Sequence, residues 1–230
     1  MEIKAADVAK LRKMTGAGMM DCKKALIEAD GDYDKAQDII RERGKLVAAK
    51  RADRSATEGV VVSKIVGQKG YMLCLACETD FVAKNSEFSA TANEILDIAI
   101  AADAADLEAL NAVAADGRTV ADKVTEKSGQ TGEKVELVYY AKIEAPMCVT
   151  YIHTNHKLGT LIGFNKEIGM EVAKDVAMQA AAMAPISISR EDCDPAVIEH
   201  ERSIGREQAR LDGKPEAMLD KIAEGKVNKF

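Results

Sequence analysis

Aromatic residues are scarce in this chain of 230 residues: Phe, Trp and Tyr together make up 4%, and Trp is absent. Proteins that bind single-stranded nucleic acids commonly stack the bases on aromatic side chains, so this composition disfavours that class. Long apolar runs are missing as well. No stretch reaches the roughly 18 consecutive apolar residues of a membrane-spanning helix, which predicts a protein without a membrane span.

The number of cysteines does not indicate a disulfide framework. The chain has five cysteines, an odd number. Its first residues have neither the apolar stretch of a signal peptide nor the arginine-rich, acid-poor pattern of a transit peptide. Reduced thiols are typical of the cytosol. We therefore expect a cytoplasmic protein.

Charge is distributed unevenly along the chain. The first 54 residues carry 13 Lys or Arg against 10 Asp or Glu, whereas the remaining 176 carry 19 against 28. Such a step predicts a small basic module attached to a larger acidic body. A moderately basic helical module is more often a solvated surface than a nucleic-acid site, and no Lys/Arg block typical of such sites occurs. We expect no direct contact with nucleic acid.

Residues 1–44 are predicted to form a module of three short helices. Residues 15–18 and 30–32 supply the turns, and Gly44 is expected to end the third helix. Residues 45–56 are charged and alanine-rich, and we interpret them as a linker that is partly helical. The apolar sides of the three helices are expected at Val8, Leu11 and Met14, at Ala25, Leu26 and Ala29, and at Ala36, Ile39 and Ile40.

Residues 57–134 are predicted to form a first core unit. A hairpin is expected from strands over 60–66 and 71–77, followed by helices over 86–115 and 120–127. Gly129 and Gly132 mark the next break.

Residues 135–193 are predicted to form a second core unit in the same order. Strands are expected over 135–144 and 147–153, paired with each other, and over 159–163, followed by a helix over 168–184. The two units together predict a duplicated α+β core.

Residues 194–230 are predicted to form a helical hairpin. Asp194 is a suitable N-cap and Pro195 a suitable first helical residue, and a turn around Gly213 separates the two helices. Their apolar faces could pair as an antiparallel coiled coil. These faces are expected to contain Val197, Ile198, Ile204 and Leu211 in the first helix, and Met218, Leu219 and Ile222 in the second.

Two short patterns could carry chemistry. Cys74 and Cys77 have the C-x-x-C spacing of redox and zinc sites, but zinc needs further soft ligands, and positions i and i+3 of a strand point to opposite faces. His153 and His156 form an H-x-x-H pattern at a strand end, with no obvious third metal ligand. Burial explains the two cysteines best, and a surface loop or a partner contact explains the histidines better than a metal. We expect neither a metal nor a cofactor.

Residues 78–85 are unusual because they place a phenylalanine, Phe81, between polar residues at a strand-to-helix junction. Phe81 could belong to the core, or it could be an exposed aromatic anchor of the kind that dominates interfaces. The chain has no nucleotide-binding or hydrolase motif and only three histidines. The sequence therefore supports an enzyme poorly.

Two segments carry a resemblance to a known family. Residues 11–26 (LRKMTGAGMMDCKKAL) and 77–85 (CETDFVAKN) closely resemble, in order and spacing, the two signatures of bacterial elongation factor Ts. Residues 151–153 followed by Gly159 look like its second core repeat, and residues 213–215 and 224–226 look like its coiled-coil hairpin. The resemblance covers essentially the whole chain.

The resemblance implies a guanine-nucleotide exchange factor for elongation factor Tu, the GTPase that delivers aminoacyl-tRNA to the ribosome. It also implies a ubiquitin-associated-like fold for the N-terminal module and no catalysis on the chain itself. In the family, a segment that here matches Thr79, Asp80, Phe81 and Val82 inserts near the magnesium site of the GTPase and promotes loss of the ion. Further partner contacts are implied for residues that match Arg12, Met19, Met20 and His153.

Four expectations stay open beside this one. The chain stops at Phe230, where many family members continue, so we expect a truncated form with an incomplete second core unit. A thiol- or metal-dependent enzyme would use Cys74, Cys77, His153 and His156, and an adaptor of the ubiquitin-associated type would use residues 1–43 alone. A homodimer is also possible.

Overall fold

The computed structural model describes residues 3–230 and begins with three helices: α1 (Ala5–Thr15), α2 (Met19–Glu28) and α3 (Tyr33–Lys50). Helix α1 ends because Gly16 adopts a left-handed conformation (φ +67°), which glycine reaches without strain. Helix α3 begins where the Asp32 carboxylate accepts hydrogen bonds from two backbone amides. The three-helix arrangement predicted for this part of the chain is confirmed.

The N-terminal helices enclose a small core of their own. Met14, which we expected on the buried side of α1, is exposed, and Thr15 is buried in its place, with its hydroxyl donating to the Leu11 carbonyl oxygen (2.9 Å). The buried residues of this core are Val8, Leu11, Ala17, Cys22, Ala25, Leu26, Ala29, Ala36 and Ile40.

Helix α3 does not end at Gly44, as we had predicted, but continues to Lys50. Gly44 lies inside the helix and is buried, because α3 crosses the core helix α7 (Val120–Thr131) there and faces Gly129. Gly129 likewise does not break its helix; only Gly132 does, with φ +71°. Both glycines permit a close helix crossing rather than a turn.

A three-stranded antiparallel sheet forms the centre of the core, in the order β1 (Glu58–Val66), β2 (Lys69–Cys77) and β5 (Glu136–Glu144). The predicted first hairpin is confirmed, since β1 pairs with β2 along its whole length. The predicted pairing of residues 135–144 with 147–153 is wrong, because β5 pairs with β2 instead.

Proline explains the missing hairpin. Residues 145–146 between β5 and β6 (Met147–Ile152) read Ala-Pro. A type I′ hairpin turn needs a positive φ at both positions, which proline cannot adopt, and a type II′ turn needs one at the first position, where alanine is strained. The chain therefore leaves the first sheet at this point. Strand β6 pairs with β7 (Gly159–Phe164) as a separate two-stranded sheet.

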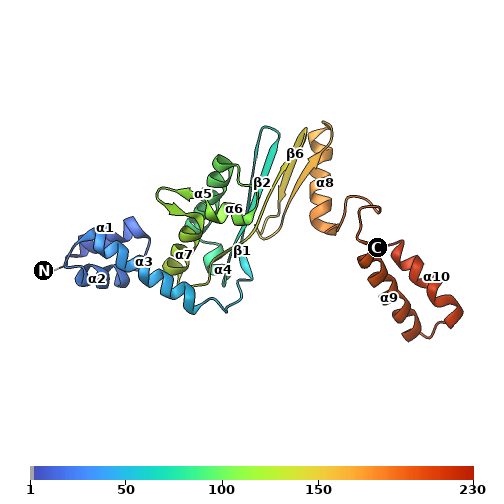
Figure 1. Cartoon of the computed structure of the whole chain (residues 1–230), viewed down its shortest axis with the longest axis horizontal. Coiled ribbons are helices and arrows are strands. Elements are labelled where there is room, and N and C mark those ends of the chain that lie inside the picture. The colour runs from blue at the N-terminus through green and yellow to red at the C-terminus, as the bar shows by residue number, and fades with distance from the viewer. Residues whose placement is uncertain (1–2) are drawn as a thin grey trace. The chain divides into compact units, whose positions relative to one another are not determined.

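The two faces of the central sheet meet different layers (Figure 1). On one face, inward residues of β1 and β2 pack against α5 (Ser86–Ala102), α6 (Leu107–Ala112) and α7. On the other face lies the β6–β7 hairpin, so close that a side chain at Gly159 would contact Val61 and Met72. The largest fully buried side chains of the main core are Leu73, Leu75, Cys77, Phe88, Ile95, Leu96, Leu110 and Val120.

The helix that we predicted over 86–115 is interrupted. Asp103 adopts a left-handed conformation (φ +47°) and ends α5, and α6 follows from Asp106, whose side chain caps it. A small two-stranded ladder, β3 (Ala114–Ala115) with β4 (Arg118–Thr119), then leads into α7. Alanine occurs in both helices and in the break between them, so the residue pattern does not mark where α5 ends.

Helix α8 (Met170–Met183) covers the outer face of the β6–β7 hairpin. Its buried residues are Ala173, Ala177 and Ala181, whose small side chains allow the helix to lie close to Val149. Each of the two hairpins is thus followed by a helix that packs on it, and the predicted α+β fold class is confirmed. No helix within residues 3–230 is long and apolar enough to cross a membrane.

Residues 183–230 form a second compact unit. It contains α9 (Pro195–Leu211), capped by Asp194, and α10 (Glu216–Val227), which pack together as a hairpin. The predicted pairing faces are partly wrong: Val197, Ile204, Leu211 and Met218 are exposed. Gly205 faces Ala223 of the second helix instead, and Ala209 is buried, because small residues bring the two axes closer together. The buried residues of α10 are Leu219, Ala223 and Val227.

Candidate functional site

Phe81 is the most exposed aromatic side chain in the described chain. It lies on the one-turn helix α4 (Asp80–Ala83), which joins β2 to α5, and 84% of the residue is accessible to solvent. The sequence left open whether Phe81 belongs to the core. The structure places it outside, while Phe88, on the first turns of α5, fills the core.

The carboxylate of Glu133 holds the residues just before helix α4 in place. Glu133 accepts hydrogen bonds from the Thr79 hydroxyl (2.6 Å), the Thr79 amide (3.0 Å) and the Glu78 amide (3.1 Å). Charge-assisted hydrogen bonds of this kind are shorter and stronger than neutral ones. Thr79 also caps α4, since its hydroxyl oxygen accepts from the Val82 amide. The turn that carries Phe81 is therefore held in one geometry.

Glu78 adds a second attachment next to the first. Its carboxylate accepts from the Lys134 amide (2.6 Å) and pairs with Arg51 (2.9 Å). The backbone hydrogen bond from Lys134, followed by the charge of Arg51, lowers the pKa of Glu78. Residues 78–79 and 133–134 thus form a reciprocal pair of carboxylate anchors across 54 or more residues of sequence.

Helix α4 forms a ridge between two grooves. On one side, Val82 lines a groove shared with Arg12, Gly18 and Gln130. On the other side, Asp80 lines a groove of about 550 Å³ together with the loop between β6 and β7. Asp80 pairs with Lys84 (2.6 Å), and that hydrogen bond is the main cause that lowers its pKa. Phe81 stands on this ridge.

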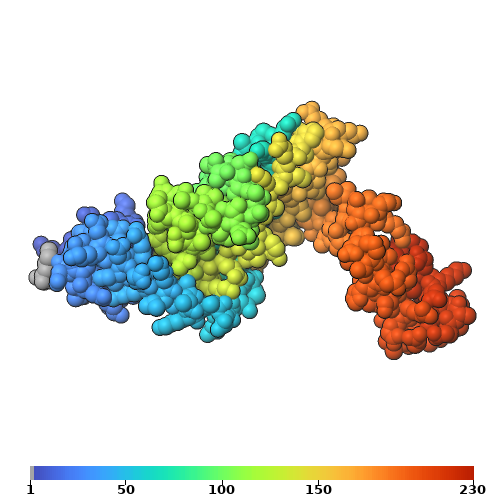
Figure 2. All heavy atoms as spheres, in the orientation of Figure 1, coloured from blue at the N-terminus to red at the C-terminus, as the bar shows by residue number. Residues whose placement is uncertain are grey.

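The N-terminal candidates lie next to the first groove. Arg12, Met19 and Met20 are all exposed, with Met20 at 64%. Arg12 and Met19 line a groove of about 710 Å³ between α1 and the core helices α5 and α7. In Figure 2 the surfaces of the N-terminal helices and of the core abut.

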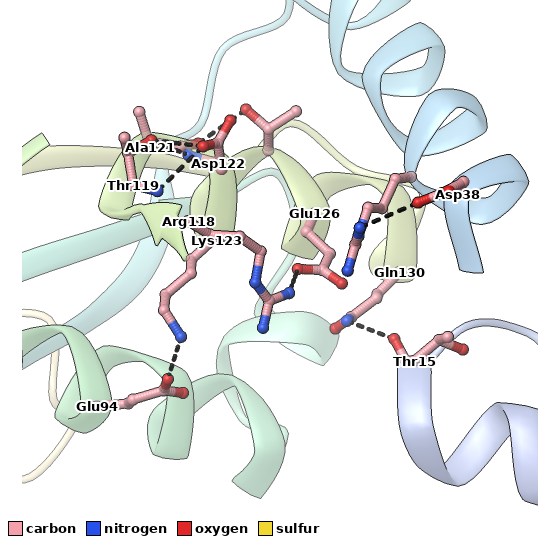
Figure 3. Close-up of polar contacts among 12 residues, drawn as sticks. Thr15, Asp38, Glu94, Arg118, Thr119, Ala121, Asp122, Lys123, Glu126 and Gln130 are labelled. Carbon is pink, nitrogen blue, oxygen red and sulfur yellow. Dashed lines mark hydrogen bonds and ion pairs between the residues drawn. The ribbon is translucent and has the colours of Figure 1, made fainter. Parts of the chain in front are cut away.

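Two ion pairs lie in the walls of this larger groove. Lys123 of α7 contacts Glu94 of α5 (2.6 Å), and Arg118 contacts Glu126 (2.5 Å), as Figure 3 shows. Arg12 lines both this groove and the one beside Val82, so the two grooves adjoin. The structure thus brings the residues of the two sequence signatures to one continuous surface.

His153 lies at the start of the β6–β7 loop and is exposed. Its Nδ1 atom is 2.8 Å from the Tyr151 hydroxyl. His156 adopts a left-handed conformation (φ +56°), and its carbonyl oxygen accepts from the Val61 amide (2.7 Å), which attaches the loop to the first sheet. His156 lines the groove beside Asp80, whereas His153 does not. The H-x-x-H pattern therefore marks a loop next to α4.

The two cysteines of the C-x-x-C pattern belong to different surroundings. Cys77 lies in the main core and donates to the Thr79 carbonyl oxygen (3.2 Å), whereas Cys74 is outside that core. Burial raises the pKa of Cys77 to about 11, which disfavours the reactive thiolate. Among residues 3–230, no three His, Cys, Asp or Glu side chains are arranged to hold a metal ion. These findings give the thiol or metal enzyme no support.

Sequence reasoning missed the residues that hold α4 in place. Glu133, Arg51 and Lys134 lie far from residues 78–85 in the chain, and nothing in their local sequence indicates a long-range contact. Gln130, which reaches the end of α1, was missed for the same reason. The only available signal was the glycine at 132, which ends α7 and turns Glu133 toward the sheet.

An exposed aromatic residue on a rigid ridge, continuous with a second exposed apolar surface, is typical of a protein that works by binding another macromolecule. Comparison with known protein families gives a match. Residues 78–230 match the family model described as Elongation factor TS.

Curated relatives match nearly the whole chain. It is 48% identical to Elongation factor Ts of Porphyromonas gingivalis over 231 residues, which is 100% of this chain and 84% of that protein. It is 47% identical to Elongation factor Ts of Cytophaga hutchinsonii, covering 99% of this chain and 84% of that protein. The chain belongs to the elongation factor Ts family and is a translation elongation factor.

Proposed function

We propose that this chain binds elongation factor Tu in its GDP-bound form and accelerates release of GDP, with Phe81 acting as the wedge that dislodges Mg²⁺. The observation that carries the proposal is the 84% exposure of Phe81 on a one-turn helix that three hydrogen bonds to Glu133 hold in place. An exposed aromatic side chain costs solvation free energy and serves the free protein poorly, whereas a partner can bury it.

Rigidity matters as much as exposure. Burying a phenylalanine side chain contributes about 1.5–3 kcal/mol. If α4 were mobile, ordering it would consume part of that gain. Because Thr79 and Glu133 already fix the turn, the gain remains available to hold the partner in a distorted form. Mg²⁺ requires near-ideal octahedral geometry, so small displacements of its ligands weaken its binding.

The exchange needs no covalent step on this chain. If the factor weakens GDP binding, then GDP weakens factor binding to the same degree, because the coupling between two ligands is reciprocal. Incoming GTP then displaces the factor from its partner. We propose accordingly that the chain is a non-catalytic exchange factor that acts in the cytoplasm, where translation takes place.

The other candidate residues would add a second contact area. Met19 and Met20 offer flexible apolar side chains, and Arg12 offers a charged anchor beside them. Their common surface adjoins the groove beside Val82. His153, at the loop on the other side of α4, would extend the contact. The whole candidate surface thus runs from α1 across α4 to the β6–β7 loop.

The test is release of a fluorescent GDP analogue from purified elongation factor Tu. We expect strong acceleration by the parent chain and at least a tenfold lower rate with Phe81→Ala. Tyr139→Ala is the matched control, because Tyr139 is also an exposed aromatic residue (72%) but lies on β5. Equal acceleration by the parent and Phe81→Ala would refute the wedge, and no acceleration by the parent would refute the exchange function.

A further inference from the structure

The last residues of helix α7 and the turn after it contact both parts of the candidate surface. We call residues 129–133 the α7 terminus. Gly129 and Gln130 contact the N-terminal helices, and Glu133 contacts the turn that carries Phe81. This segment of five residues therefore connects Arg12 and Met19, on one side, with α4 on the other.

The first contact is the crossing of α3 over α7. A Cβ atom built on Gly129 would overlap the Cα atom of Gly44, whereas a Cβ on Gly44 would lie at an ordinary 3.5 Å from the Cα of Gly129. The crossing therefore tolerates a methyl group on α3 but not on α7. Neither glycine needs a positive φ, so alanine suits both backbones.

The second contact is made by Gln130. Its side-chain amide donates to the Thr15 carbonyl oxygen (2.6 Å), one of the unpaired acceptors at the end of α1, and its amide group packs on Gly16. Figure 3 shows Gln130 reaching from α7 to Thr15. The turn at 16–18, which separates Arg12 from Met19, is thereby attached to the core.

The third contact is the hydrogen-bonded attachment of α4 to Glu133. Because Gly129, Gln130 and Glu133 are neighbours on one short segment, the N-terminal helices and α4 share a common support. A shift of α7 would move both surfaces, and a loss of one contact would release only one of them.

We propose that the α7 terminus is a positioning segment that sets the spacing between the Arg12–Met19 surface and Phe81, so that both engage the partner at the same time. The inference rests on the proposed function and extends it. Two linked surfaces that bind together gain affinity by a factor of about 10²–10⁴ over one surface, provided that the geometry allows simultaneous contact. Docking of the N-terminal helices then determines the affinity for the partner, and α4 determines the rate of release.

The test compares Gly129→Ala with Gly44→Ala, the same change on the two sides of one crossing. The rate of release of the fluorescent GDP analogue is measured at increasing concentrations of each variant. For Gly129→Ala we expect the half-saturating concentration to rise at least tenfold while the rate at saturation stays within twofold. For Gly44→Ala we expect both values within twofold of the parent. Gln130→Ala, which removes one hydrogen bond without a steric clash, should change the same quantity in the same direction.

Amide hydrogen exchange provides a readout that does not depend on the partner. In Gly129→Ala, protection should fall over residues 44–50 and 125–131 and remain over 22–40, the inside of the N-terminal module. A docked Gly129→Ala protein would overturn the steric argument, and an undocked one with unchanged half-saturation would overturn the positioning role. Absence of acceleration by the parent chain would instead mean that the proposed function has failed, and the inference with it.

Discussion

Replacing Glu133 by glutamine should loosen the turn that carries Phe81. The carboxylate accepts three hydrogen bonds from Glu78 and Thr79, over 2.6–3.1 Å. The amide keeps one acceptor oxygen, loses the charge and turns an NH₂ group toward the remaining donors. Hydrogen bonds to a charged group contribute about 1.5–3 kcal/mol and neutral ones about 0.5–1.5 kcal/mol. We expect residues 78–84 to lose about 1–3 kcal/mol of local stability.

Native-state hydrogen exchange measures this loss where it occurs. A loss of 1–3 kcal/mol corresponds to a roughly 5- to 160-fold decrease in protection of the amides of residues 78–84. Glu136→Gln is the matched control, because it removes the same charge from a surface ion pair with Lys134 (3.0 Å). Surface ion pairs contribute little to stability, so the protection of residues 78–84 in Glu136→Gln should stay within about twofold of the parent.

Glu133→Gln also separates the effect of an ordered helix α4 from the effect of an exposed Phe81. Phe81 remains present and exposed in Glu133→Gln, yet the rate of GDP release at saturation should fall, because ordering α4 now costs part of its binding free energy. If residues 78–84 are as well protected in Glu133→Gln as in Glu136→Gln, the three hydrogen bonds do not hold the turn. If protection falls and the saturating rate is unchanged, rigidity of α4 is not needed for exchange.

Three further predictions concern acid, thiol chemistry and the core. Hydrogen bonds from Lys69, Tyr71 and Lys142 lower the pKa of Asp103 from 3.8 to about 2. Asp103 therefore contributes stability above pH 4 that is lost as the pH falls toward 2. Asp103→Asn should flatten an acid titration followed by circular dichroism in that range. Because the pKa of Cys77 is about 11 rather than 9.0, its alkylation at pH 8, followed by mass spectrometry, should be about 100-fold slower than that of a free thiol peptide; equal rates would contradict its burial. Phe88→Ala should cost about 3–5 kcal/mol in thermal unfolding, because Phe88 fills the core, and Phe81→Ala less than about 0.5 kcal/mol; equal costs would contradict the assignment of the two rings.

Local sequence patterns predicted most of the elements. The N-cap residues Asp32 and Asp194 and the left-handed glycines at 16 and 132 act within one turn of the chain, so their effect can be derived from neighbouring residues. The alternating pattern of the first hairpin likewise reports burial on one face of the sheet. The α+β class followed from the order of such elements.

The errors have a common cause, which is contact between distant segments. Gly44 and Gly129 were interpreted as helix breakers, since glycine has a low helix propensity, but each lies inside a helix because the other helix needs the space. Strand β5 was paired with its sequence neighbour, although Ala145 and Pro146 together fit neither of the favoured tight turns that this pairing requires. This second error could have been avoided from the sequence alone.

The candidate site was predictable only in part. The polar neighbours of Phe81 raised the question of its exposure, and the family resemblance pointed to residues 79–82. Neither could show that Glu133 holds this turn or that Gln130 holds the end of α1, since both contacts join segments 54 and 115 residues apart.

We propose that the chain releases GDP by removing Mg²⁺, and varying the magnesium concentration tests this step. Release of the fluorescent GDP analogue from elongation factor Tu is measured with and without the chain, first at millimolar Mg²⁺ and then with the ion chelated. We expect a large acceleration in the presence of Mg²⁺ that mostly disappears after chelation, because the ion is then already absent. The same fold acceleration under both conditions would contradict it.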